Sequence, residues 1–120
     1  MKILIVGHDA EGVAVIGKIL RRRGYDITCC ADKDETAELI EEKHIRLVIA
    51  DMEADEKERI CFCKTIKSMP KPPGLLVIGN SGEEEEKMLN AGADDWIKKP
   101  YKTAVFLART SALMRRCINE

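Results

Sequence analysis

The chain has 120 residues, a length that forms one domain with a substantial core. Apolar residues make up 45% of it and aromatic residues only 4%, so we expect a core of aliphatic side chains. Charged residues make up 34% and almost cancel, with a net charge of −1, which gives no electrostatic case for nucleic-acid binding. No apolar stretch approaches the roughly 20 residues that span a bilayer. No export signal precedes the first apolar run, so we expect a cytoplasmic protein without a membrane partner.

The chain contains five cysteines, at positions 29, 30, 61, 63 and 117. An odd number of cysteines without an export signal argues against a disulfide framework. Zinc sites usually show two ligand pairs with short, regular spacing, and these positions do not have that form. We therefore expect small thiols that are buried or half-buried, and no metal site built on them.

Short apolar runs alternate along the chain with segments of helical periodicity. The expected strands are 2–6, 25–30, 46–50, 75–78 and 95–98. The expected helices are 10–23, 33–43, 56–68, 82–91 and 103–117. Asp32 and Ser81 stand where capping residues belong, each followed three residues later by a glutamate. Glu83 to Glu86 fall in the first turn of the fourth helix, and such a charge run is usually a solvated face.

Five consecutive strand–helix units predict an α/β fold with a doubly wound, five-stranded parallel sheet and helices on both faces. The flavodoxin-like strand order 2-1-3-4-5 is the leading candidate. No glycine-rich phosphate-binding pattern follows the first strand, which argues against the nucleotide- and flavin-binding versions of this architecture.

Asp51 directly follows the apolar run 47–50, which has the character of a strand buried on both faces. Ligands and chemistry in open α/β folds gather at the carboxyl edge of the sheet, where this carboxylate is expected. The commoner fate of an aspartate after a strand is to open a loop or cap a helix. Other suitable residues arrive at the same edge, and they favour a functional role for Asp51.

Three stretches carry a resemblance to a known family. Residues 2–6 read Lys-Ile-Leu-Ile-Val, residues 47–51 read Leu-Val-Ile-Ala-Asp, and residues 91–101 read Ala-Gly-Ala-Asp-Asp-Trp-Ile-Lys-Lys-Pro-Tyr. Together they resemble the receiver domain of the bacterial response regulators, the CheY-like superfamily. The similarity covers essentially residues 1–120, so we expect a single receiver-like domain with no attached output domain.

The resemblance implies a role for each matching residue. Asp51 is the implied phosphoacceptor, which holds a phosphoryl group as an acyl phosphate, and Lys99 is the implied contact to the phosphoryl oxygens. Trp96 takes the place of the switch aromatic, usually Tyr or Phe, although a tryptophan there can simply cover the sheet edge. For Lys99 the alternative is a surface lysine ahead of Pro100.

The sequence also departs from the family pattern. Gly7 and His8 replace the two acids that hold Mg²⁺, and Asp9 comes one residue late, so at most a weak Mg²⁺ site on Asp9 and Asp51 remains. Gly79 replaces the switch hydroxyl, and Ser81 lies two residues further on. Asp55 stands where the family has proline, and the glycine expected a few residues later is absent around Arg59.

Two hypotheses follow. In the first, the chain is a receiver in a two-component phosphorelay, phosphorylated on Asp51 by a histidine kinase or phosphotransfer protein and read by a downstream protein. In the second, it is a phosphorylation-independent pseudo-receiver, a protein-interaction module in which Asp51 and Lys99 form a structural ion pair. Neither hypothesis makes it an enzyme.

A weak homodimer through the fourth helix, fifth strand and fifth helix is a further expectation from the resemblance. Its expected charges are Glu83 to Glu86, Asp94 and Asp95 against Arg109, Arg115 and Arg116.

Overall fold

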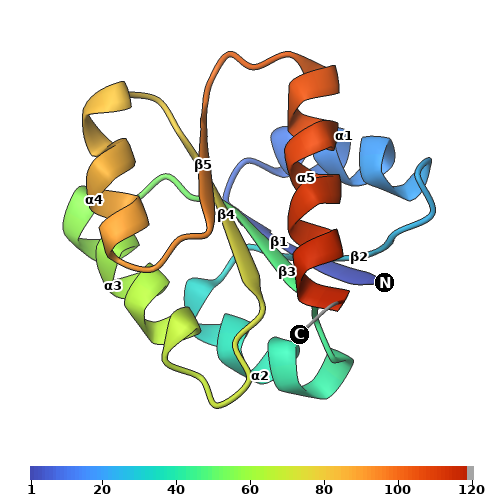
Figure 1. Cartoon of the computed structure of the whole chain (residues 1–120), viewed down its shortest axis with the longest axis horizontal. Helices are drawn as coiled ribbons and strands as arrows, with labels where there is room; N and C mark the ends of the chain where they lie inside the picture. Colours follow the sequence, from blue (N-terminus) through green and yellow to red (C-terminus); the bar gives the residue numbers. More distant parts are fainter. Residues whose placement is uncertain (119–120) are drawn as a thin grey trace.

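The computed structural model describes residues 1–118, which form five parallel strands and five α-helices in alternation (Figure 1). The strands are β1 (Lys2–Gly7), β2 (Asp26–Cys30), β3 (Leu47–Asp51), β4 (Gly74–Gly79) and β5 (Asp95–Lys98). The helices are α1 (Ala10–Arg21), α2 (Thr36–Lys43), α3 (Glu56–Lys67), α4 (Glu85–Asn90) and α5 (Thr103–Ile118). The sheet order is β2-β1-β3-β4-β5, which confirms the predicted doubly wound, flavodoxin-like fold.

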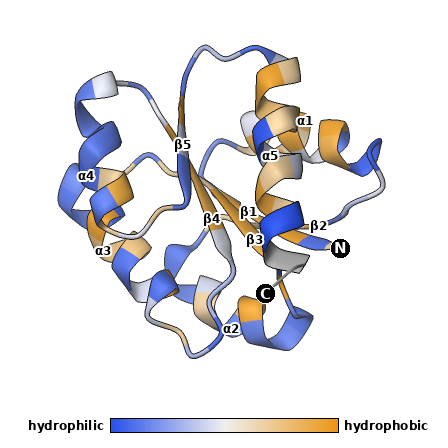
Figure 2. Cartoon of the chain, in the orientation of Figure 1, coloured by the Kyte–Doolittle hydropathy of each residue, from blue (hydrophilic) through white to orange (hydrophobic). Residues whose placement is uncertain are grey.

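Helices cover both faces of the sheet, so the central strands have no solvent-facing side (Figure 1). Successive residues of a strand point to opposite faces. Leu47 and Ile49 pack with α1 and α5, whereas Val48 and Ala50 pack with α2, α3 and α4. This two-sided burial explains why the central strands are unbroken apolar runs, which stand out as the hydrophobic centre of Figure 2.

Two of the expected helices begin differently from the prediction. A 3₁₀ turn, Lys33–Glu35, precedes α2, and another, Gly82–Glu84, precedes a short α4. In each case the capping side chain accepts a hydrogen bond from the N–H two residues later, Asp32 from Asp34 and Ser81 from Glu83. The first turn is therefore tighter than a capping box would make it.

The first helix also ends earlier than expected, at Arg21 rather than Arg23. Gly24 follows with a φ of +89°, a left-handed conformation that glycine adopts without strain and that returns the chain to β2. Within residues 1–118, no helix has both the length and the apolar character that a membrane crossing requires.

The cysteines divide into two kinds. Cys30 and Cys63 are buried, as expected, and burial raises the pKa of the Cys63 thiol to about 11. Cys29 and Cys61 are exposed, which the sequence did not predict. Among the residues that the structure describes, no three His, Cys, Asp or Glu side chains gather in a metal-binding group. The side chain of Cys117 lies outside the described part of the chain.

Candidate functional site

Asp51 and Lys99 meet at the carboxyl edge of the sheet. Asp51 is the last residue of β3, and Lys99 directly follows β5, where its N–H donates to the Gly79 carbonyl over 2.8 Å. Lys99 Nζ lies 2.7 Å from Asp51 Oδ1. The carboxylate side chain is 10% exposed and the lysine side chain 40%, so the pair is set into the edge but open to solvent on the lysine side.

Tyr101 belongs to the same neighbourhood. Burial raises the pKa of its phenol, and the negative charge of Asp51 raises it further. The ring stacks on Phe106, with 5.2 Å between centroids, which fixes it against the start of α5. A role for Tyr101 was not predicted from the sequence, where the only signal was its position two residues after Lys99.

Residues 7–9, at the end of β1 and directly after it, do not bring carboxylates to Asp51. Gly7 lies beside Asp51 in the β1–β3 register, and a Cβ on it would come within 2.9 Å of the Asp51 carbonyl oxygen and 2.8 Å of Val13 Cγ2. Asp9 is the N-cap of α1, where its Oδ1 accepts from the Glu11 N–H over 3.2 Å. His8 is exposed.

These donors do not suit Mg²⁺, which takes oxygen ligands in an octahedral arrangement. The resemblance implies several carboxylates around the ion, but here Asp51 pairs with Lys99 and the Asp9 carboxylate is engaged at the helix start. The expected weak site on Asp9 and Asp51 therefore stays a prediction, with a helix cap that competes against it.

Gly79 ends β4 beneath two side chains. A Cβ on Gly79 would come within 2.7 Å of Trp96 Nε1 and 2.8 Å of Trp96 Cζ2, and it would collide with Glu84 Oε1. Trp96 is 5% exposed, so its ring is part of the core as well as a cover for the sheet edge. The space beside Gly79 is thus filled by neighbouring side chains, whereas Ser81 caps the next turn from an exposed position.

Glu84 corrects the expectation of a solvated run from Glu83 to Glu86. It is 7% exposed, whereas its three glutamate neighbours are exposed. Its carboxylate makes a two-pronged ion pair with the guanidinium of Arg59 on α3: Arg59 Nη1 donates to Oε1 over 2.9 Å, and Nη2 donates to Oε2. The sequence did not predict this pair; the only signals for it were the departures from the family pattern around Arg59 and at Gly79.

Comparison with known proteins agrees with this geometry. The family model described as "Response regulator receiver domain" matches residues 3–111. The chain belongs to the response regulator receiver family. Receiver domains are generally signalling modules rather than enzymes, they commonly bind Mg²⁺ at the phosphorylation site, and they interact with histidine kinases or phosphotransfer proteins and with downstream domains.

Solved structures show the same fold. The chain is 28% identical to the BeF3-activated N-terminal receiver domain of RstA from Klebsiella pneumoniae, covering 96% of this chain and 99% of that one with a TM-score of 0.83. It is 25% identical to a CheY-like receiver domain protein from Methanospirillum hungatei, covering 98% and 96% with a TM-score of 0.84. A two-component response regulator from Clostridium difficile is 22% identical over 97% of both chains, with a TM-score of 0.84.

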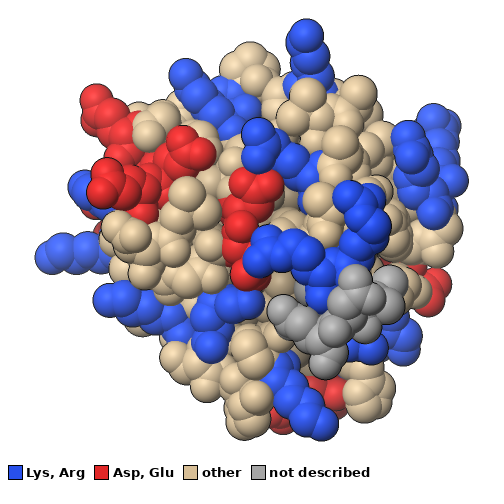
Figure 3. Space-filling model, in the orientation of Figure 1, with Lys and Arg blue, Asp and Glu red and all other residues tan. Residues whose placement is uncertain are grey.

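The face formed by α4, β5 and α5 of this receiver carries both charges and apolar groups. Figure 3 shows acidic side chains gathered over α4 and basic ones over α5. Arg109 pairs with Asp95 of its own chain at 3.0 Å, so this arginine is engaged within the monomer. Leu89 and Val105 are 40% and 41% exposed, so this face also presents apolar side chains to solvent.

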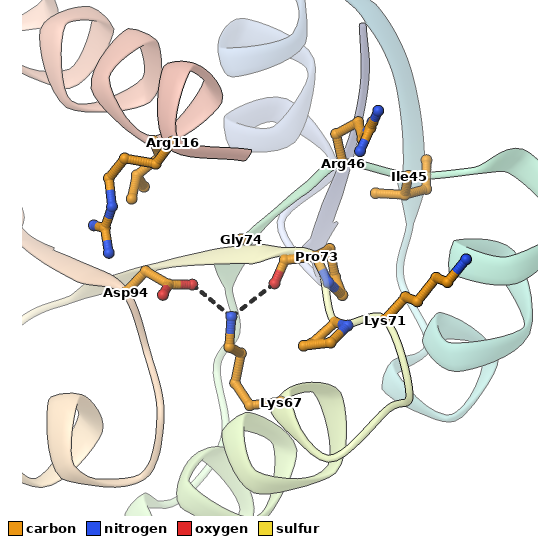
Figure 4. A pocket seen from close by; sticks show the side chains of 10 residues that line it. Ile45, Arg46, Lys67, Lys71, Pro73, Gly74, Asp94 and Arg116 are labelled. Atoms are coloured by element: carbon orange, nitrogen blue, oxygen red, sulfur yellow. Dashed lines mark hydrogen bonds and ion pairs between the residues drawn. The ribbon is translucent and has the colours of Figure 1, made fainter. Parts of the chain in front are cut away.

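A separate hollow of about 570 Å³ lies at the opposite, amino edge of the sheet (Figure 4). On its wall, Lys67 Nζ donates to Asp94 Oδ2 over 2.8 Å and to the Pro73 carbonyl over 2.9 Å. Lys67 and Arg116 lie in the last turns of α3 and α5, where they offset the negative ends of the helix dipoles. Neither Asp51 nor Lys99 is among the residues that line this hollow.

Asp51→Asn is expected to change the free energy of unfolding by about 1 kcal/mol or less, because an ion pair with so exposed a lysine contributes little. A pocket with three carboxylates would gain stability from the same substitution, since it relieves repulsion between like charges. Urea unfolding of the two proteins without divalent metal measures the difference. A gain of several kcal/mol would show that uncompensated negative charge still crowds Asp51.

Proposed function

We propose that this receiver accepts a phosphoryl group on Asp51 from a histidine kinase or phosphotransfer protein, and that a downstream protein reads the resulting state. The observation that supports this best is the 2.7 Å contact between Asp51 Oδ1 and Lys99 Nζ at the carboxyl edge of the sheet. A nucleophilic carboxylate and a cation are thereby held side by side where this architecture places its chemistry.

In the proposed reaction, an Asp51 carboxylate oxygen attacks phosphorus. The new O–P bond forms as the bond from phosphorus to the donor's imidazole nitrogen breaks, and that nitrogen keeps the electron pair. Lys99 stays charged throughout and offers its ammonium to the oxygens of the transferring group as a compact point charge. Its partly exposed position leaves it free to turn from the carboxylate to the phosphoryl oxygens.

The second hypothesis, a phosphorylation-independent pseudo-receiver, has its own support in the arrangement around Gly79. Trp96 is already buried there, and Glu84 fills the space that a side chain at position 79 would need. In that case Asp51 and Lys99 are a structural ion pair, and the module acts through its surface alone.

Incubation with a small phosphodonor and Mg²⁺, followed by intact mass spectrometry, distinguishes the two hypotheses. We expect one added phosphoryl group on the unaltered protein and none on Asp51→Asn. Lys99→Ala should slow the addition without preventing folding, because the lysine side chain is partly exposed. An unchanged mass for the unaltered protein under conditions that phosphorylate another receiver would overturn the phosphoacceptor proposal.

We also propose a weak homodimer through the face formed by α4, β5 and α5. Leu89 and Val105 supply exposed apolar area on this face. Glu85 and Arg115 are exposed residues of opposite charge on it. Exposed charges are screened by salt, so sedimentation velocity should show a larger average mass at low salt than at high salt. Arg115→Glu should weaken the low-salt association, whereas Arg22→Glu at the end of α1 serves as the control. A monomer at both salts and high protein concentration would contradict the dimer.

A further inference from the structure

We infer that Glu84, held in place by Arg59, is the residue that positions Trp96 against the end of β4. In this role it takes over the space that the family gives to a hydroxyl side chain at position 79. The inference goes beyond the proposed function, because it concerns the unmodified chain and does not depend on phosphorylation of Asp51.

The first support is the crowding around Gly79. Both Glu84 Oε1 and the Trp96 indole border the position that a Cβ at residue 79 would occupy. A glycine at this point is what allows the carboxylate and the indole to approach β4 together. A threonine or serine here would have to displace one or both of them.

The second support is the burial of charge. The side chains of Arg59 and Glu84 are 12% and 10% exposed, and the ion pair bridges α3 to the residue that immediately precedes α4. Burying two charges costs free energy. The best-supported role of a buried ion pair is to fix one arrangement of the elements around it. Here the arrangement that it fixes includes the start of α4 and the ring of Trp96 on β5.

The third support is that two buried N–H groups next to Glu84 lack a hydrogen-bond acceptor. Within the described residues, Trp96 Nε1 and Arg59 Nε are buried without a hydrogen-bond partner. The indole N–H borders the same small space as the Glu84 carboxylate, so the negative charge of Glu84 offsets part of the cost of burying it. Removing the charge of Glu84 removes this compensation, so burial of the Trp96 indole becomes less favourable.

The consequence is that the position of Trp96 in this receiver depends on a different set of residues. Trp96 stands where the family has its switch aromatic, and its burial is secured by an ion pair between α3 and the turn before α4 rather than by the residue at the end of β4. Changes in the pair will move Trp96 and the start of α4 together.

Fluorescence tests this inference, since Trp96 is the single tryptophan of the chain. Emission maximum and acrylamide quenching are compared for the unaltered protein, Glu84→Gln and Glu84→Ala, all without phosphodonor. In both variants we expect emission shifted to longer wavelength and a quenching constant raised about twofold or more, because the indole leaves its buried site. Glu84→Gln keeps the shape of the side chain and removes only its charge, so a role limited to filling space would leave Trp96 unmoved in this variant.

Glu56→Gln is the matched control, because Glu56 on α3 pairs with Lys87 on α4 at 2.9 Å between side chains that are 45% and 57% exposed. It should leave both fluorescence readings unchanged. Circular dichroism identifies the variants that remain folded, and Glu84→Gln decides the matter if Glu84→Ala does not fold. Emission and quenching in folded Glu84→Gln that equal those of the unaltered protein would overturn the inference. Because no phosphodonor is present, this outcome is distinct from a failure of Asp51 to accept a phosphoryl group.

Discussion

Arg59→Met is expected to lower the free energy of unfolding by about 3–5 kcal/mol, because it leaves the Glu84 carboxylate buried without its partner. Such a loss is a large fraction of the roughly 5–15 kcal/mol that stabilises a domain of ordinary size. Urea unfolding monitored by far-ultraviolet circular dichroism gives the value independently of Trp96.

The double variant Arg59→Met, Glu84→Met should recover much of that loss, since it removes both charges and fills the space with apolar groups of similar length. The difference between the double variant and the sum of the two single ones measures the coupling of the pair. Lys87→Met, which breaks the exposed pair between Lys87 on α4 and Glu56 on α3, should cost only about 0–1 kcal/mol. Equal losses for Arg59→Met and Lys87→Met would contradict the structural importance assigned to the buried pair.

His8→Asp is expected to raise the affinity for Mg²⁺ about tenfold or more, equivalent to about 1.4 kcal/mol of binding free energy. The substitution returns one carboxylate to the pair of positions that the family uses for the ion, and hard oxygen ligands are what Mg²⁺ prefers. His8 is exposed, so the change should leave the fold intact. Isothermal titration calorimetry with MgCl₂ measures both proteins.

Gly7→Asp provides the contrast. Its Cβ would press on Val13 and on the Asp51 backbone, so this variant should lose stability. Asp9→Ala tests the remaining acid: because Asp9 caps α1, it should cost about 0.5–2 kcal/mol of stability and change Mg²⁺ binding little. Unaltered protein that binds Mg²⁺ as tightly as His8→Asp would show that the substituted positions are no handicap.

The fold could be predicted because its signals are local. Apolar runs of four to five residues mark the buried strands, and helical periodicity between them marks the crossovers, so the strand order followed from general rules of parallel sheets. The carboxyl-edge position of Asp51 could be predicted in the same way, whereas the role of Lys99 came from the family resemblance; in the structure Asp51 ends β3 and Lys99 directly follows β5.

The buried contacts around Gly79 could not be predicted in this way. Arg59 and Glu84 are 25 residues apart, and Glu84 stands in a run of four glutamates whose other members are all exposed. Only the packing of α3 against the turn before α4 decides which one is buried. The direction of the Asp9 side chain, whose Oδ1 caps α1, likewise depends on local geometry that the residue type alone does not give.

Chemical trapping of the acyl phosphate tests the central claim most directly. After treatment with a small phosphodonor and Mg²⁺, borohydride reduces an aspartyl phosphate to homoserine, which peptide mass spectrometry locates in the chain. The phosphoacceptor proposal predicts homoserine at position 51, and none in a sample without the phosphodonor. Homoserine at another aspartate, or at no position in protein shown to be folded, would contradict it.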